Sequence, residues 1–172
     1  MKYLLSITLI IITMNVSAQK LNKHTHDTSH NQDILINVCT REGLVTFPQF
    51  KEMYEPLYSA YLPDSATMIQ LKKLVKSERI KVVLGTWCGD SKVYVPNFFK
   101  VLDLIQFKEK NMEIIAVDGH KKAENGVIDG LDIQSVPTFI VYDKKGKELG
   151  RIVEHPKTTL EGDLLAILQK KS

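Results

Sequence analysis

The stretch that decides the fold is Gly85-Thr86-Trp87-Cys88-Gly89-Asp90-Ser91, which directly follows the apolar run Ile80-Lys81-Val82-Val83-Leu84. A short apolar run that ends in a glycine turn predicts a buried strand. If a helix begins after the turn, Cys88 lies at its N-terminus, where free N–H groups and the helix dipole favour an anion. Because the thiolate is the reactive form of cysteine, this position predicts an exposed and activated thiol. The alternative is a buried, inert thiol.

A second apolar strand is predicted further along the chain, where Val136-Pro137-Thr138 precedes Phe139-Ile140-Val141-Tyr142. Together the two segments resemble the thioredoxin superfamily, in which a Trp-Cys-x-x-Cys turn faces a cis-proline loop. The resemblance covers residues 80–169, with strands expected at 80–85, 112–117, 138–142 and 148–153. Between them we expect a helix to about Phe107 and a short helix near 123–131, and a last helix closes the domain. This implies an α/β, thioredoxin-like fold, a central mixed sheet flanked by helices, with an N-terminal helical extension.

The resemblance implies a role for each residue of the turn. Cys88 matches the attacking cysteine, and Ser91 stands where the family has its resolving cysteine. The Ser91 hydroxyl either donates a hydrogen bond to the Cys88 thiolate or is a neutral replacement, and it forms no disulfide. Cys88 and Ser91 are therefore the expected catalytic residues. The expected substrate-binding residues are Trp87, Gly89, Asp90, Val136 and Pro137.

Two departures from the family indicate slow or absent two-thiol chemistry. Asp90 replaces a common proline; its carboxylate suits a helix N-terminus but repels a thiolate. Val82 replaces a buried acid that accepts protons in many thioredoxins. A cis Pro137 would leave the backbone of Val136 free to pair with an extended substrate. Monothiol glutaredoxins also use a Cys-x-x-Ser turn, but they have an aromatic residue at position 90 and no preceding tryptophan, so an altered thioredoxin fits better.

The other cysteine, Cys39, is either a buried small side chain or a remote resolving thiol. The second role requires Cα atoms within about 7 Å of each other. Three histidines, His24, His26 and His30, lie beside Asp27 in a polar segment. They could ligate copper or zinc, but no cysteine or supporting shell is visible nearby, so we predict no metal site.

The N-terminal region divides into three predicted segments before the domain at 77–172. Residues 1–18 are expected to be a secretory signal peptide, with Lys2 before an apolar stretch and small residues ahead of Gln19. The apolar stretch is too short to span a bilayer, so no stable membrane anchor is expected after cleavage. Residues 19–33 are polar and are expected to be a disordered tether. Residues 34–76 are expected to be a helical extension.

Composition narrows the function further. The chain has 23 basic and 20 acidic residues, a formal net charge of +3, which is too balanced to indicate a nucleic acid or an anionic membrane as partner. Two cysteines in an exported chain suggest a working thiol rather than a disulfide scaffold. We therefore predict a periplasmic or secreted protein that exchanges thiols and disulfides through one nucleophilic cysteine, by mixed-disulfide, isomerase or monothiol chemistry. It would use protein or small-molecule thiols and disulfides and no cofactor. The alternative is a non-catalytic module that binds extended polypeptide segments, so the sequence leaves open whether this is an enzyme.

Overall fold

A mixed sheet of six strands crosses the molecule in the spatial order β1-β2-β4-β3-β5-β6. The computed structural model describes residues 20–170, so the predicted signal peptide at 1–18 lies outside the described residues. β3 and β4 run parallel, and every other neighbouring pair is antiparallel. The strands are β1 (Lys23–Asp27), β2 (Gln32–Cys39), β3 (Arg79–Leu84), β4 (Met112–Ala116), β5 (Thr138–Tyr142) and β6 (Glu148–Val153).

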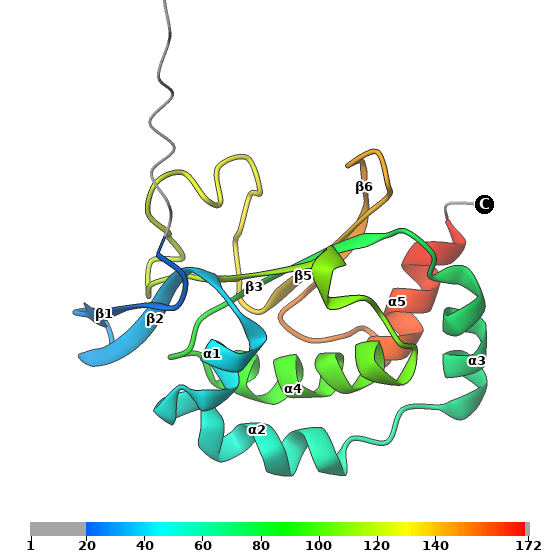
Figure 1. Cartoon of the computed structure of the whole chain (residues 1–172), viewed down its shortest axis with the longest axis horizontal. Helices are drawn as coiled ribbons and strands as arrows, with labels where there is room; N and C mark the ends of the chain where they lie inside the picture. The colour runs from blue at the N-terminus through cyan, green and yellow to red at the C-terminus, as the bar shows by residue number, and fades with distance from the viewer. Residues whose placement is uncertain (1–19, 171–172) are drawn as a thin grey trace, which may run out of the picture.

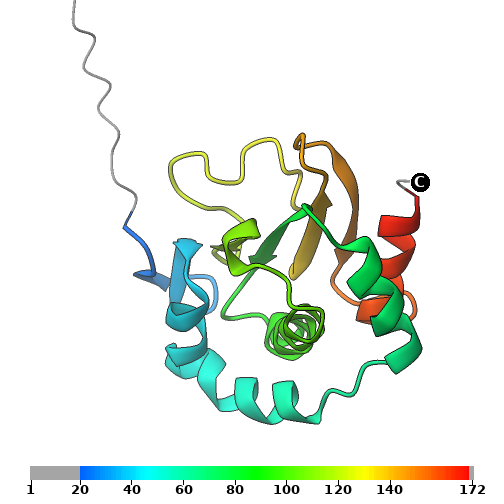
Figure 2. The same cartoon turned by 45° about the vertical axis from the view of Figure 1, so that its right-hand side comes forward.

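The five α-helices gather on one face of this sheet, around a central helix that follows β3 (Figures 1 and 2). Figure 2 looks nearly along this helix, α4, with the sheet on one side and the other helices around the rest. The main hydrophobic core lies between them and includes Phe50, Phe98, Phe99 and Phe139. No described helix is long and apolar enough to cross a membrane. The helices are α1 (Arg41–Thr46), α2 (Pro48–Ala60), α3 (Ser65–Leu74), α4 (Gly89–Leu104) and α5 (Leu160–Gln169), with a short 3-10 helix, η1 (Glu109–Asn111), before β4.

Polar bonds fasten the outer helices to this core. The Arg41 guanidinium donates two hydrogen bonds to the Asp103 carboxylate, at 2.7 and 2.5 Å, and lies over the Phe99 ring. On the other side, Glu161 of α5 is 2% exposed and accepts a bond of 2.6 Å from the Tyr61 hydroxyl. These contacts join α1 to α4 and the end of α2 to α5.

The opposite face of the sheet is covered by a loop, residues 118–137, rather than by a helix (Figure 2). Its apolar side chains, including Val127 and Ile128, pack on Val83 and Ile115 of the sheet. The short helix predicted near 123–131 is therefore absent, and the segment is a series of turns. The physical reason is local: Asn125, Gly126 and Gly130 have positive φ angles of 55°, 71° and 74°, which interrupt right-handed helix.

The N-terminal segments also differ from expectation. Residues 23–39, predicted as the end of a disordered tether and the start of a helical extension, form the antiparallel hairpin β1–β2 instead. β2 adds to the edge of β4, with Cys39 opposite Ile114. The Asn37 side-chain amide donates a hydrogen bond to the Glu124 carboxylate and accepts one from the Glu124 backbone N–H. Lys23 forms an ion pair of 2.6 Å with the same carboxylate. A polar segment is thus ordered by long-range hydrogen bonds, which composition alone does not reveal.

Candidate active site

Cys88 is the N-cap residue of α4, as the strand–turn–helix pattern predicts. Its backbone N–H bonds the Gly85 carbonyl at 3.0 Å, which closes the turn, and its own carbonyl accepts the first helical bond, from Lys92. The side chain is partly exposed, and its apolar neighbours include Val117 and Val136. The structure therefore presents this sulfur at a helix N-terminus, where the unpaired N–H groups favour a negative charge.

The loop before β5, which contains Val136 and Pro137, contacts this sulfur. The Cys88 S–H donates a hydrogen bond of 3.2 Å to the carbonyl of Val136, although the two residues are 48 positions apart. The peptide bond between Val136 and Pro137 is cis. The Pro137 carbonyl accepts a bond from the Glu154 N–H at 2.7 Å, so the loop is held from the β6 side as well. The tertiary fold thus brings three of the predicted site residues, Cys88, Val136 and Pro137, into one place.

Ser91 is fully buried beneath the turn. Its hydroxyl accepts a hydrogen bond of 3.2 Å from the Gly85 N–H, the backbone group at the end of β3. This contact gives Ser91 a structural part in the turn, because it pairs a buried backbone donor. The Ser91 hydroxyl proton is not used in this bond, and no hydrogen bond joins the hydroxyl to the Cys88 sulfur.

Trp87 lies over the turn, partly buried. Its indole N–H donates to the Val117 carbonyl at 3.0 Å, at the end of β4. Gly85 makes this arrangement possible: a Cβ at that position would lie 2.5 Å from the indole Cε2 atom. The tryptophan therefore folds back on the ends of β3 and β4. Gly89 and Asp90, the other two predicted substrate-binding residues, are exposed in the first turn of α4.

Cys39 lies elsewhere. It is opposite Ile114, which is itself opposite Val82, so Cys39 is two strands away from β3. Two strand spacings already amount to about 10 Å, beyond the Cα separation of about 7 Å that a disulfide allows. Its side chain is 5% exposed in the helix-side core, and burial raises the pKa of its thiol to about 12. The remote resolving role considered for Cys39 does not fit this geometry, and both cysteines are free.

Two residues beside the turn were not predicted as site residues. The His30 ring stacks on the Trp87 indole, with centroids 4.2 Å apart and planes within 18°. Its Nδ1 atom lies 2.7 Å from the carboxylate of Asp27, which is 6% exposed. The sequence carries His30 only as one of three candidate metal ligands. No three His, Cys, Asp or Glu side chains in residues 20–170 are grouped so that they could hold a metal ion.

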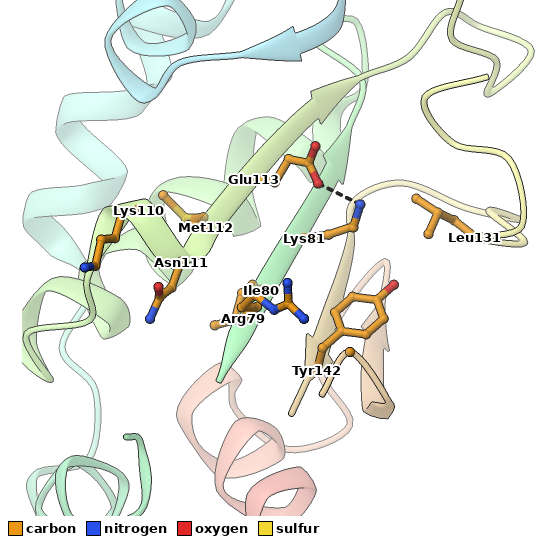
Figure 3. A pocket seen from close by; sticks show the side chains of 10 residues that line it. Arg79, Ile80, Lys81, Lys110, Asn111, Met112, Glu113, Leu131 and Tyr142 are labelled. Atoms are coloured by element: carbon orange, nitrogen blue, oxygen red, sulfur yellow. Dashed lines mark ion pairs between the residues drawn. The ribbon is translucent and has the colours of Figure 1, made fainter. Parts of the chain in front are cut away.

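A groove lies at the other end of the sheet from Cys88. Its volume is about 450 Å³, and it runs past the starts of β3 and β4 and the end of β5 (Figure 3). Lys81 and Glu113 form an ion pair of 2.6 Å across its floor, and the Tyr142 ring lines one side (Figure 3). Because Cys88 follows the opposite end of β3, this groove is separate from the thiol site.

Comparisons with known proteins agree with this architecture. A crystal structure of a protein of unknown function from Pseudomonas aeruginosa matches with a TM-score of 0.52 and 23% identity, over 72% of this chain and 84% of that chain. The crystal structure of an HIV epitope-scaffold matches with a TM-score of 0.49 and 24% identity, over 70% of this chain and 82% of that one. No curated protein matches the chain.

At such identities the first of these structures shows a common fold and nothing about activity. The stronger finding is a family model described as Thioredoxin, which matches residues 48–165 and therefore well over half of the chain. That range contains the turn at Cys88, the loop at Pro137 and the four strands β3 to β6. The chain therefore belongs to the thioredoxin family.

Proposed function

We propose that this protein exchanges thiols and disulfides through Cys88 alone. The observation that carries the proposal is the position of the sulfur: it is partly exposed at the start of α4 and 3.2 Å from the Val136 carbonyl. A helix N-terminus favours the thiolate that such chemistry requires. The neighbouring backbone of Val136 is suited to pairing with an extended substrate strand.

In this reaction the Cys88 thiolate attacks one sulfur of a substrate disulfide. A bond forms between Cys88 and that sulfur, the substrate S–S bond breaks, and the other sulfur leaves as a thiolate that takes up a proton. Ser91 has no sulfur, and Cys39 is two strands away, so neither residue resolves the mixed disulfide. An external thiol must do so, attacking the mixed disulfide and releasing the Cys88 thiolate. The net result is isomerisation or removal of a small-thiol adduct, not dithiol reduction.

The test uses a protein with scrambled disulfides in a glutathione buffer, with recovery of its native activity as the readout. We expect the wild-type chain to accelerate recovery and Cys88→Ala to lose that acceleration. Cys39→Ala is the matched control, because it removes the other thiol and is expected to behave as wild type. Equal rates for wild type and Cys88→Ala would contradict the proposal.

A second candidate is a non-catalytic module that binds extended polypeptide. It is favoured by Val82, which is fully buried where many thioredoxins have a proton-accepting acid, and by the burial of Ser91 under its bond to Gly85. This candidate predicts that unfolded polypeptides bind equally well to wild type and Cys88→Ala, while neither protein accelerates isomerisation.

We also propose that the chain is exported, to the periplasm or outside the cell. The support is the leader pattern in residues 1–18. Expression of the full chain in a bacterium, followed by intact-mass analysis of each cell fraction, tests this. We expect the recovered protein to begin at Gln19 and to be absent from the cytoplasmic fraction. An uncleaved protein in the cytoplasm would contradict it.

A further inference from the structure

The hairpin β1–β2 brings a histidine to the thiol site. Its tip, residues 28–31, packs on Trp87 and on Gly119, where a Cβ would lie 2.6 Å from the His30 ring and 2.1 Å from the Ser29 oxygen. The Leu35 N–H also bonds the Thr86 hydroxyl, at 3.2 Å, so the hairpin is fastened to the turn itself. His30 is therefore held against the indole by contacts with Asp27 and Gly119, while its side chain remains 35% exposed.

A buried carboxylate orients the His30 ring. Burial by itself raises the pKa of Asp27, but hydrogen bonds from Ser29 and His30 lower it to about 2, so Asp27 is ionised. Ser29 donates from its hydroxyl at 2.7 Å and its N–H at 3.2 Å, and His30 Nδ1 lies at 2.7 Å. An ionised carboxylate only accepts hydrogen bonds, so at this distance the Nδ1 atom of His30 carries the proton.

The surroundings of Cys88 supply a reason for a nearby positive charge. The thiol donates to the Val136 carbonyl, so ionisation removes this bond and leaves a negative sulfur facing a carbonyl oxygen. Its neighbours in this cluster are apolar, and they solvate a thiolate poorly. His30 is bonded to Asp27 and stacked on Trp87, the residue that directly precedes Cys88 in the turn.

We propose that His30 is a positioning residue for Cys88: its imidazolium, stacked on Trp87 and held by Asp27, stabilises the Cys88 thiolate, and its neutral form does so less. The inference rests on the proposed thiol chemistry of Cys88. A cation on the face of an indole is itself favourable, so protonation also tightens the stack. The other titratable groups nearby are Asp118 and His120, on either side of Gly119. The Asp118 carboxylate bonds the N–H groups of His120 and Lys122 and so turns into its own loop.

The chain offers a direct probe, because Trp87 is its only tryptophan. An imidazolium in contact with an indole quenches its fluorescence, so we expect emission to rise in one step as the pH is raised through the range where His30 deprotonates. Cys88→Ala should keep this step, His30→Phe should abolish it, and Asp27→Asn should move its midpoint to lower pH. His26→Phe is the matched control, because His26 lies on the same hairpin but is exposed and pairs with Asp33.

The second measurement is the rate at which iodoacetamide alkylates Cys88, a reaction in which the thiolate displaces iodide, followed against pH. Loss of the His30 charge should reduce the rate of Cys88 alkylation at pH 6 by about three- to tenfold. We expect a loss of that size in His30→Phe and no change in His26→Phe. If His30→Phe does not fold, His30→Gln replaces it, since glutamine can still donate to Asp27 but does not titrate.

The outcomes separate this inference from the proposed function. Flat fluorescence across the pH range, or unchanged alkylation in folded His30 variants, overturns the role of His30 and leaves the chemistry of Cys88 standing. Slower alkylation in these variants, with no isomerisation by the wild type, supports the role of His30 in thiol ionisation and overturns the proposed exchange activity.

Discussion

Replacing Ser91 by cysteine should convert the single thiol of the turn into a disulfide-forming pair. Ser91 lies three residues after Cys88, the N-cap of α4. Helical geometry places their Cα atoms about 5 Å apart, within the range of about 4.4 to 6.8 Å that disulfides occupy. A mild oxidant should therefore close the bridge without backbone movement. The wild-type chain, which has no second thiol in the turn, should form only mixed disulfides under the same conditions.

The size of the effect follows from the same contacts. Ser91→Cys weakens the bond to the Gly85 N–H, which should destabilise the reduced form by about 1 kcal/mol. Closing the loop of residues 88–91 should then stabilise the oxidised form by about 2 kcal/mol relative to the reduced form. Urea unfolding of the two forms measures this difference. Ser91→Ala is the control, with the same loss of the Gly85 bond and no change on oxidation.

Intact mass and thiol counting identify the bridge. Before labelling, oxidised Ser91→Cys should be about 2 Da lighter than its reduced form, because closing the bridge removes two hydrogen atoms. After unfolding and alkylation of the oxidised protein, only Cys39 should be labelled. If the thiols at 88 and 91 instead alkylate independently under oxidising conditions, the side chain at 91 does not face Cys88. The assignment of this turn as a thioredoxin-type site would then be wrong.

Three further outcomes are expected elsewhere in the fold. Asp103→Asn should lower the free energy of unfolding by about 1 to 3 kcal/mol, since Arg41 loses its partly buried partner, and urea unfolding measures it. Burial raises the pKa of Asp103, but the hydrogen bonds from Arg41 and Tyr58 and the charges of Arg41 and Lys100 together lower it below its usual value. The stabilisation by Asp103 should be present above the unfolded-state pKa and vanish as the pH falls through the native one, so an equal loss at all pH values would contradict this. Tyr61→Phe should lower the free energy of unfolding by about 1 to 2 kcal/mol, because the buried Glu161 carboxylate loses a hydrogen-bond donor. Thermal unfolding at neutral pH measures this, and an unchanged midpoint would refute it. Cys39 should resist alkylation in the folded protein and react only in urea, and labelling at the same rate as Cys88 would show that it is not buried.

The part of the site predicted from sequence is the part made by neighbouring residues. The apolar run at 80–84 and the turn at Cys88 predict a strand and a helix because both depend on local periodicity and capping. The helix ends at Leu104 rather than at about Phe107, an ordinary boundary error. The resemblance then pointed to the loop at Pro137. In the structure the carbonyl of the preceding residue, Val136, accepts the hydrogen bond from the Cys88 thiol.

The hairpin and the loop at 118–137 escaped prediction for different reasons. Residues 23–33 are polar and show no buried stripe, so the pattern alone indicated disorder. Their order comes from partners far away in the chain, such as Glu124, which binds Lys23 across 101 positions. In the loop, glycines with positive φ override a weak helical pattern.

The sequence by itself determined a thiol at a strand–helix junction, since adjacent residues specify a strand, a turn and an N-cap through bonds within a few positions. Only the tertiary structure decided which groups surround that thiol: Ser91 turned beneath it toward Gly85, Cys39 two strands away, and His30 stacked on Trp87. These contacts join segments whose separation in the chain leaves no periodic trace, because they depend on which strands pair and on where a hairpin tip comes to rest.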